Sequence, residues 1–520
     1  MLENVYLPLE CTDKSSPHNM SDFIIEKVDT VNVKVRCERG LAKEMSDFFT
    51  FKVPGYKFMP QYRNKVWDGT IKLYNMFSQT IYCGLLDYVY KFAEDRKYTI
   101  DVPNPQDFTT ENHTTDEWVE KFINDRLQPV ESGQRICAHK HQISAVTHAI
   151  NHDRCLLLSP TASGKSLIIY SLVRYYMNKI DDDKKILIIV PTTSLVSQMY
   201  SDFSEYSEAD TSFDQKDMHV VFSGREKTCD TCKIVISTWQ SLYKLPKEYF
   251  DQYAAVFGDE CHLFKSKSLT SLMTKLTKCP YRIGTTGTLD GTQTHKLVIE
   301  GLFGPVYNVT TTKELMDKNL LSKLKIDTIL LKYPVKEKEQ VKKAKYQDEI
   351  KWLINNEKRN DFIVNMSLNL KGNTLILFQF VDEHGKKLHS SIQQKVGTKR
   401  DVFFIYGGTD VEVREQVRHI VEKNDNAIIV ASYGTFSTGV SIRKLHNIIF
   451  ASPSKSRIRV LQSIGRQLRR SESKEVAKLY DIGDDLSWKS YKNHTLRHFA
   501  ERIKIYDAEK FNYNPVVVKL

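Results

Sequence analysis

The chain has 520 residues, and at about 150 residues per domain this length corresponds to three or four domains. Hydrophobic residues make up 41% of the sequence, aromatic residues 11% and charged residues 27%, which excludes a disordered or fibrous protein. Lys and Arg number 75 against 64 Asp and Glu, and this formal net charge of +11 favours a polyanionic partner.

The sequence also bears on the cellular compartment. No apolar run approaches the roughly 18 residues that a membrane-spanning helix needs, so we expect no membrane association. The nine cysteines are scattered along the chain, which favours free thiols in a reducing cytoplasm. Cys229 and Cys232 have half the spacing of a zinc site, but no second Cys or His pair lies at a suitable distance, so we expect no zinc.

The N-terminal part predicts a tail followed by a small α+β domain. Residues 1–20 show no hydrophobic periodicity and are expected to form the tail, in which Met1 and Met20 are alternative starts. The domain is expected over residues 21–112, and it ends in a polar, proline-containing linker. Its predicted strands lie over 31–37, around Ile71 and Ile81 and near 98–102, and its predicted helices over 39–49 and 85–96.

The remaining residues predict two α/β domains in tandem, over 113–315 and 316–520. In both, short β-branched runs alternate with helical patterns, which is typical of parallel sheets covered by helices. A charged stretch over 332–361 separates the two series of strands, and its part over 336–351 is expected to be an exposed helix or a lead-in to the second domain. The strands are expected at 156–158, 186–190, 233–236, 254–257 and 281–284, and then at 373–380, 401–406, 427–431 and 447–450.

A phosphate-binding loop is predicted at residues 159–166, Ser-Pro-Thr-Ala-Ser-Gly-Lys-Ser, which follow an apolar strand and begin a helical pattern. Amides at the helix start would hold phosphate oxygens, Lys165 would neutralise the β- and γ-phosphates, and the Ser166 hydroxyl would bind Mg²⁺. Ser159 replaces the first glycine of the usual pattern, but Gly164 still permits the close approach. The alternative is an ordinary strand–turn–helix with a chance Gly-Lys-Ser. The predicted ATP-binding residues of this loop are Thr161, Ala162, Ser163, Gly164, Lys165 and Ser166.

A second strand ends in the acids Asp259 and Glu260, followed by Cys261 and His262. Asp259 is predicted to hold Mg²⁺ and Glu260 to polarise the attacking water. Two acids at a strand end often cap a helix, and a single histidine is often structural. The phosphate-binding lysine about ninety residues upstream favours the nucleotide site, with His262 contacting a coupling segment.

Motifs in a fixed order make the chain resemble superfamily 2 helicases. In the first domain, residues 191–195, 237–242 and 286–288 are similar to motifs Ia, Ib and III. In the second, residues 431–441 and 462–469 are similar to motifs V and VI, the latter as Gln-x-x-Gly-Arg-x-x-Arg. The segments 48–51, 55–60, 67–73 and 509–513 extend the resemblance, from about residue 20 to 520, to the UvsW-type helicases of T-even-like phages.

This resemblance implies two RecA-like domains with an ATP cleft between them and ATP-dependent activity, with Mg²⁺, on junctions, stalled forks and R-loops. The implied partners are branched DNA, single-stranded DNA, RNA–DNA hybrids and single-strand-binding or recombination proteins, in the host cytoplasm. Arg466 and Arg469 are implied to reach the γ-phosphate from the second domain, and Gly439 to lie at the nucleotide. The implied coupling residues are His262, Thr286, Thr288 and Gln462, and the implied nucleic-acid contacts are Pro191, Thr192, Thr193, Thr238 and Thr438.

Two positions depart from the family pattern. Family members carry an aromatic–Gln pair before the phosphate-binding loop, whereas this chain has His141 and Gln142 there. Gln142 is still predicted to hydrogen-bond the adenine edge. Ser441 replaces the acid that usually ends motif V, and a hydroxyl carries no charge.

Rings and positive charges alternate in the small N-terminal domain. This composition is typical of a nucleic-acid platform, although a domain of this size also needs aromatic residues for its core. The predicted contacts are Tyr56, Lys57, Arg63, Lys65 and Trp67. Two other functions remain open, an RNA-dependent ATPase or RNA helicase of the same superfamily and a nucleotide-gated clamp on nucleic acid.

Overall fold

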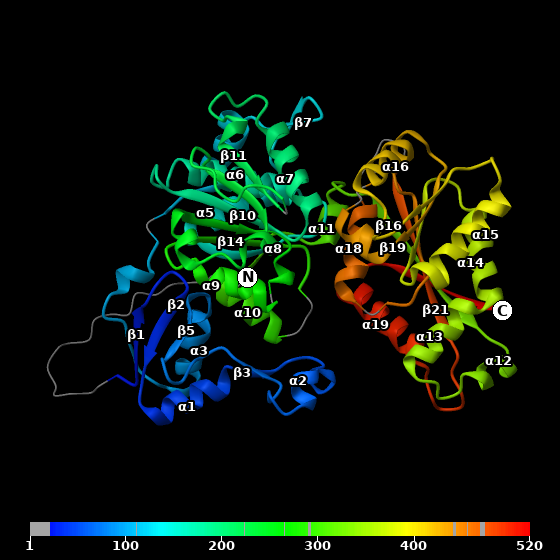
Figure 1. The fold of residues 1–520 in the computed structure, drawn as a ribbon, viewed down its shortest axis with the longest axis horizontal. Coiled ribbons are helices and arrows are strands. Elements are labelled where there is room, and N and C mark those ends of the chain that lie inside the picture. The colour runs from blue at the N-terminus through cyan, green and yellow to red at the C-terminus, as the bar shows by residue number, and fades with distance from the viewer. Residues whose placement is uncertain are drawn as a thin grey trace. The chain divides into compact units, whose positions relative to one another are not determined.

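The computed structural model describes residues 21–520, except 111, 223, 265, 290–292, 440, 441, 443, 455 and 469–473. The predicted tail, Ser441 and Arg469 therefore lie outside the described residues. The chain divides into two units, Met1–Thr109 and Thr110–Leu520 (Figure 1). Within the described residues, no helix is both long enough and apolar enough to cross a bilayer.

The first unit is a four-stranded sheet packed against two helices. The strand order is β5-β2-β1-β6, in which β1 is antiparallel to β2 and parallel to β6. Phe23 and Ile25 of β1 are fully buried, as are Val33 and Val35 of β2. The bounds are β1 Phe23–Lys27, β2 Asn32–Arg36, α1 Arg39–Phe48, β5 Thr80–Tyr82, α3 Leu86–Arg96 and β6 Ile100–Asp101.

A small arm is inserted between α1 and β5. Its base is the antiparallel pair β3 (Thr50–Lys52) and β4 (Thr70–Lys72), and its tip contains the short helix α2 (Pro60–Arg63). The Tyr56 ring contacts the Tyr62 ring edge-on at 4.7 Å, and a Cβ on Gly69 would lie only 2.3 Å from the Tyr56 ring. The interior of the arm is therefore filled by aromatic rings.

The second unit contains two seven-stranded parallel sheets, which confirms the predicted α/β class with two tandem RecA-like domains. The first sheet has the order β11-β12-β10-β13-β14-β9-β15. Its strands are β9 Arg154–Leu158, β10 Lys185–Val190, β11 Met218–Val221, β12 Ile234–Thr238, β13 Tyr253–Gly258, β14 Tyr281–Thr286 and β15 Val306–Asn308. Its helices are α4 Asp116–Lys121, α5 Lys140–His152, α6 Lys165–Met177, α7 Thr193–Tyr206, α8 Trp239–Leu242, α9 Lys267–Lys275, α10 Gln293–Phe303 and α11 Thr312–Asp317.

The second sheet has the order β18-β19-β17-β20-β21-β16-β22. Apolar clusters cover both faces of this sheet, and its central strands are therefore continuous apolar runs. Its strands are β16 Lys323–Lys332, β17 Thr374–Phe378, β18 Val402–Ile405, β19 Ile428–Ser432, β20 Asn447–Phe450, β21 Val476–Asp485 and β22 Tyr513–Lys519. Its helices are α12 Val335–Gln340, α13 Tyr346–Asn355, α14 Glu357–Asn369, α15 Lys386–Val396, α16 Val411–Lys423, α17 Tyr433–Gly439, α18 Arg457–Gln467 and α19 His494–Ala508.

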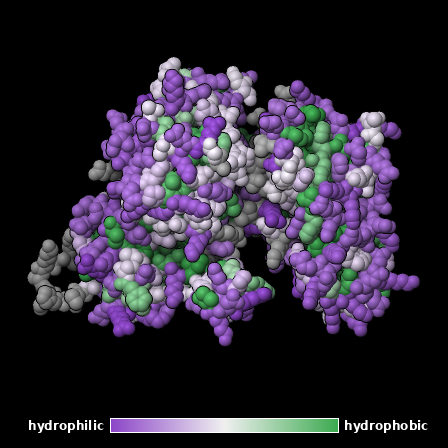
Figure 2. All heavy atoms as spheres, viewed as in Figure 1, coloured by the Kyte–Doolittle hydropathy of each residue, from purple (hydrophilic) through white to green (hydrophobic). Residues whose placement is uncertain are grey.

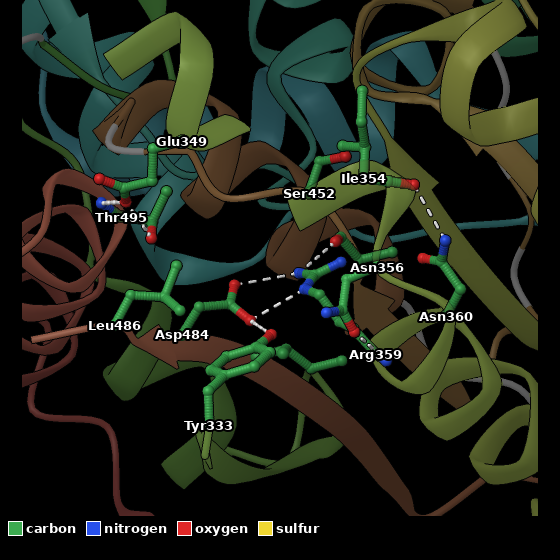
Figure 3. Close-up of polar contacts among 12 residues, drawn as sticks. Tyr333, Glu349, Ile354, Asn356, Arg359, Asn360, Ser452, Asp484, Leu486 and Thr495 are labelled. Atoms are coloured by element: carbon green, nitrogen blue, oxygen red, sulfur yellow. Dashed lines mark hydrogen bonds and ion pairs between the residues drawn. The ribbon is translucent and has the colours of Figure 1, made fainter. Parts of the chain in front are cut away.

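A buried ion pair joins α14 to the end of β21. Arg359 and Asp484 are both fully buried, with Nε 2.8 Å from Oδ1 and Nη2 3.1 Å from Oδ2 (Figure 3). Tyr333 donates its hydroxyl to Asp484 Oδ1 at 2.7 Å, and Arg359 Nη2 also donates to the Ala451 carbonyl at 2.8 Å. Polar contacts thus tie the carboxyl ends of β20 and β21 to one helix.

Candidate functional site

The predicted phosphate-binding loop connects β9 to α6. Ala162 and Gly164 adopt left-handed backbone conformations, with φ of 68° and 81°. Lys165 Nζ lies 3.3 Å from the Ser159 carbonyl and 3.5 Å from the Pro160 carbonyl, so its charge is held at the loop. Lys165 and Ser166 form the first turn of α6, where free amides and the helix dipole favour an anion.

Gln142 and His141 from α5 contact the same loop. Gln142 Nε2 donates to the Ser163 carbonyl at 3.2 Å, and His141 Nε2 lies 3.0 Å from that carbonyl. A Cβ on Gly164 would lie 2.1 Å from Gln142 Nε2, and the left-handed φ of 81° also favours glycine there. Gln142 therefore supports the loop in this structure, and its contact with adenine stays a prediction.

The two acids follow β13 at the same edge of the sheet. Between β13 and β9 lies β14, so residues that follow β14 stand between the acids and the phosphate-binding loop. Thr285 Oγ1 donates to Asp259 Oδ1 at 2.7 Å, and Glu260 has a left-handed backbone with φ of 51°. Strained backbone at Ala162 and Glu260 is typical of functional sites.

His262 connects Glu260 to the segment that follows β14. Its Nδ1 atom lies 3.2 Å from Glu260 Oε2 and 3.1 Å from Thr286 Oγ1. Thr286 Oγ1 in turn donates to the Thr288 carbonyl at 3.1 Å. The side chains of His262, Thr286 and Thr288 are buried. Together with Glu260, these predicted residues form one network of contacts.

Nearby charges separate the pKa values of the two acids. Burial, followed by the negative charge of Glu260, raises the pKa of Asp259. Burial by itself would also raise the pKa of Glu260. The hydrogen bond with His262 and the charges of Lys165 and Arg466 outweigh this effect, so the pKa of Glu260 is lowered. Glu260 is therefore ionised and able to accept a hydrogen bond from water.

Helix α18 of the second domain contacts the phosphate-binding loop. A Cβ on Gly465 would lie 2.5 Å from Thr161 Cβ, and Ala162 packs against the apolar cluster of the second domain. Arg466 follows Gly465, and its guanidinium lies 5.9 Å from the Phe436 ring centre. Gln462 is half-buried in the same helix. The structure thus brings Thr161, Glu260 and Arg466 to one site.

The predicted nucleic-acid residues of the first domain follow two neighbouring strands. Val190 of β10 pairs in register with Thr238 of β12, which places Pro191 beside Thr238, and the Gln240 amide donates to the Pro191 carbonyl at 3.3 Å. Thr192 caps α7, and α7 contacts α17, the helix whose last turn contains Thr438 and Gly439. Thr438 and Gly439 belong to motif V.

The start of α17 is held by the strand ends of its own domain. Tyr433 donates its hydroxyl to the Ser452 carbonyl at 3.0 Å. The Gln379 amide donates to Ser452 Oγ at 3.1 Å. These contacts fix the orientation of the motif V helix on the sheet.

The predicted contacts of the N-terminal unit lie on its arm. Lys57, Arg63 and Lys65 are exposed, whereas the Tyr56 and Trp67 side chains are half-buried, and Trp67 Nε1 donates to the Thr70 carbonyl at 2.8 Å. Between β3 and β4, the most exposed apolar side chains of the arm are Val66 at 80% and Phe58 at 76%, which the predicted set leaves out.

The donor chemistry of the site fits Mg²⁺. Asp259 offers a carboxylate, and Ser166 offers a hydroxyl at the start of α6, and Mg²⁺ prefers such oxygen ligands together with phosphate and water. Thr285 was absent from the predicted set, although it positions Asp259. The run Thr285, Thr286, Gly287, Thr288 at the end of a buried strand is the signal that could have identified it.

Comparisons with known proteins agree with this arrangement. Residues 22–103 match the family model "DNA helicase UvsW, N-terminal", residues 135–291 match "Type III restriction enzyme, res subunit", and residues 357–471 match "Helicase conserved C-terminal domain".

Two relatives extend over most of the chain. The ATP-dependent DNA helicase uvsW of Enterobacteria phage T4 is 34% identical over 514 residues, covering 96% of this chain and 100% of the relative. The DNA 3'-5' translocase XPB2 of Sulfurisphaera tokodaii is 21% identical, covering 79% of this chain and 91% of the relative.

Solved structures give the same result. The crystal structure of T4 UvsW covers 96% of this chain and 99% of its own, with 33% identity and a TM-score of 0.51. A fragment of a type I restriction enzyme HsdR subunit from Vibrio vulnificus covers 77% of this chain and 72% of its own, with 16% identity and a TM-score of 0.55, which shows a shared fold.

Proposed function

The chain belongs to the UvsW family of ATP-dependent DNA helicases, and we propose that it uses ATP to remodel branched DNA, namely junctions, stalled forks and R-loops. The observation that carries the proposal is the contact between α18 and the phosphate-binding loop, because it makes the nucleotide site depend on both RecA-like domains. Nucleotide binding can then control the separation of the domains.

Each site residue has a role that its position supports. Lys165 neutralises the phosphates, and Glu260 orients and activates water through its ionised carboxylate. Asp259 and Ser166 hold Mg²⁺, which supplies charge neutralisation at the phosphates when it is bound. Arg466 brings positive charge from the second domain. Arg469, which follows in motif VI, is proposed for the same role.

The coupling route begins at His262. Its ring contacts both Glu260 and Thr286, so a change at the γ-phosphate can be passed to the segment that follows β14. Gln462 and Thr288 complete the proposed coupling set.

The proposed DNA track crosses both domains. Pro191, Thr192, Thr193 and Thr238 follow adjacent strands of the first domain, and α17 with Thr438 contacts α7. Such hydroxyls and amides bind sugar–phosphate without reading bases. We propose 3′ to 5′ translocation, which agrees with the name of the S. tokodaii relative, and a host-cytoplasmic location.

The N-terminal unit is proposed to select branched structures through its arm. Lys57 and Arg63 are exposed beside the apolar Phe58 and Val66, a combination that suits phosphates next to exposed base pairs. Lys57→Gln with Arg63→Gln should lower the preference for a junction over a single strand. Lys43→Gln with Lys91→Gln, which removes the same charge from the helices of this unit, should leave the preference unchanged.

A substrate panel tests the proposed function. Strand displacement with ATP is measured on a four-way junction, a fork, an R-loop and a plain tailed duplex, with Lys165→Ala as the control. Faster remodelling of the first three substrates supports the proposal. Equal or faster unwinding of a plain RNA duplex would instead identify an RNA helicase, and DNA binding that responds to ATP without any displacement would identify a clamp.

A further inference from the structure

A basic surface of the second RecA-like domain lies outside all the motifs described above. Two loops and the start of α19 form it; the loops are residues 486–493, which connect β21 to α19, and residues 341–345, which connect α12 to α13. We call it the basic loop face and define it by its exposed cations, Lys342, Lys343, Lys345, Lys489, Lys492 and Arg497.

Aromatic side chains hold the two loops together. Trp488 and Tyr491 exchange backbone hydrogen bonds of 3.0 Å across a tight turn, whose residue Lys489 has a left-handed φ of 53°. Lys342 Nζ lies 5.7 Å from the Trp488 ring centre. The Arg497 guanidinium lies 5.2 Å from the Tyr491 ring centre. The cations are therefore arranged on a framework of half-buried rings.

The base of the face is fixed by a buried carboxylate. Glu349 of α13 accepts hydrogen bonds from the Thr495 amide and hydroxyl at 2.7 Å each (Figure 3). It also accepts one from Asn493 Nδ2 at 2.8 Å. It also accepts the His494 amide at 2.9 Å. The free amides at the start of α19 are thus satisfied, and the cations above them are the groups that remain available to a ligand.

The charges near the face are mostly positive. Glu339 pairs with Lys342 at 3.4 Å, and Asp348 is an exposed acid on α13. Asp485 is bound by Lys338 at 3.8 Å, and Glu349 is fully engaged in the base. The face therefore has six exposed cations and two exposed acids. Figure 2 shows mostly hydrophilic residues over the lower part of this domain, where α12 and α13 lie.

The face lies at the same edge of the sheet as the motif V helix. Both α17 and the loop 486–493 follow carboxyl ends of parallel strands, β19 and β21, and the sheet order separates these strands by three steps. Three strand spacings of about 4.8 Å give roughly 14 Å. At about 3.4 Å per base pair this distance corresponds to about four base pairs of duplex.

We propose that the basic loop face is a second nucleic-acid contact, which binds the sugar–phosphate backbone of duplex DNA adjoining the segment held at the motif V helix. This inference deepens the proposed function, on which it rests. Lysines around rings bind a polyanion whatever its sequence, which favours nucleic acid as the occupant of the face. The contact would keep an arm of the branched substrate beside the motor domain.

The test is the salt dependence of DNA binding by the full-length protein without nucleotide. The slope of log K against log salt is negative, and each lost phosphate contact reduces its magnitude by about 0.9. Lys489→Gln with Lys492→Gln should therefore reduce the magnitude of the slope for a four-way junction by about 1.8. The affinity difference from wild type should then shrink about 3.5-fold for each doubling of salt. Lys489→Arg with Lys492→Arg keeps the charge and should restore the slope.

A matched control removes the same charge elsewhere in the second domain. Lys504→Gln with Lys386→Gln changes two exposed lysines that lie outside the face, and it should leave the slope at its wild-type value. A slope for the Lys489 and Lys492 variant equal to that of this control would overturn the proposed contact, and so would an equal loss of slope in the arginine variant. Failure of the proposed function is recognised separately, since wild type would then show no ATP-driven remodelling of the junction.

Discussion

The buried pair of Arg359 and Asp484 gives a prediction whose size follows from the structure. Both side chains are fully buried, and two hydrogen bonds of 2.8 and 3.1 Å join them. Arg359→Leu leaves the Asp484 carboxylate with Tyr333 as its hydroxyl donor and without its cation. Removing one partner of such a pair costs about 3–5 kcal/mol of unfolding free energy.

The double variant separates loss of the pair from loss of packing. Arg359→Leu with Asp484→Leu removes both charges, and replacing a buried pair by apolar residues is often neutral. We therefore expect the double variant to recover at least about 2 kcal/mol relative to the sum of the two single changes.

Thermal unfolding measures this effect. At about 2–4 °C per kcal/mol for a domain of this size, Arg359→Leu should lower the melting temperature of the second domain by about 10 °C. The transition is followed by circular dichroism and calorimetry on the full chain. A shift below about 2 °C for Arg359→Leu, or simple additivity of the two changes, would show that the buried pair does not stabilise the domain in this way.

Three further predictions concern the nucleotide site and pH. Glu260→Gln should lower steady-state phosphate release by about 10²–10³-fold while fluorescent-nucleotide binding persists, and unchanged turnover would remove Glu260 from the reaction. Gly465→Ala should slow DNA-stimulated hydrolysis about tenfold, because its Cβ would meet Thr161 at 2.5 Å, whereas Gly407→Ala, which meets nothing within 4 Å, should not. Burial, together with the charge of Arg359 and that of Lys387, lowers the pKa of His384 to about 3. Its folded pKa is therefore below its unfolded value near 6.5, so stability is complete above that value and is lost as pH falls. Chemical unfolding should show about 2 kcal/mol more loss between pH 7 and 5 in wild type than in His384→Gln, and identical pH profiles would contradict the assignment.

The motifs were predictable because each is local in sequence. The phosphate-binding loop, the acids and motif VI each occupy a few adjacent residues at a strand end or in one helix, so residue type and spacing identify them without knowledge of contacts. The central strands were predictable for the same reason, since β10, β12 and β13 are continuous apolar runs.

The sequence patterns of β1, β11, β16 and β21 did not predict strands. β16 and β21 mix charged residues with apolar ones, so they resemble the charged stretches around them. β1 has only three apolar residues in sequence and β11 has four residues in all, and runs of that length do not distinguish strand from helix. The positions of these strands in their sheets depend on pairing with strands that are distant in sequence.

The segment over 336–351 was predicted to be an exposed helix or a lead-in to the second domain, but it follows β16 of that domain's sheet and is only partly exposed. The structure has two helices there, and α13 buries Glu349, Ile350 and Leu353. The partner of Glu349 is the start of α19, more than a hundred residues away, so no local pattern could have shown that this acid is buried. Thr285, Arg359 and Asp484 likewise acquire their roles only through contacts between distant segments.

Measuring hydrolysis and remodelling in the same sample tests directly whether ATP drives the remodelling of branched DNA. Phosphate release and separation of a four-way junction are followed together for wild type, Lys165→Ala and Glu260→Gln. We expect that the junction stimulates phosphate release in wild type, that separation requires ATP, and that both activities are lost in both variants. Junction separation that persists in Lys165→Ala, or that proceeds without ATP, would contradict this expectation.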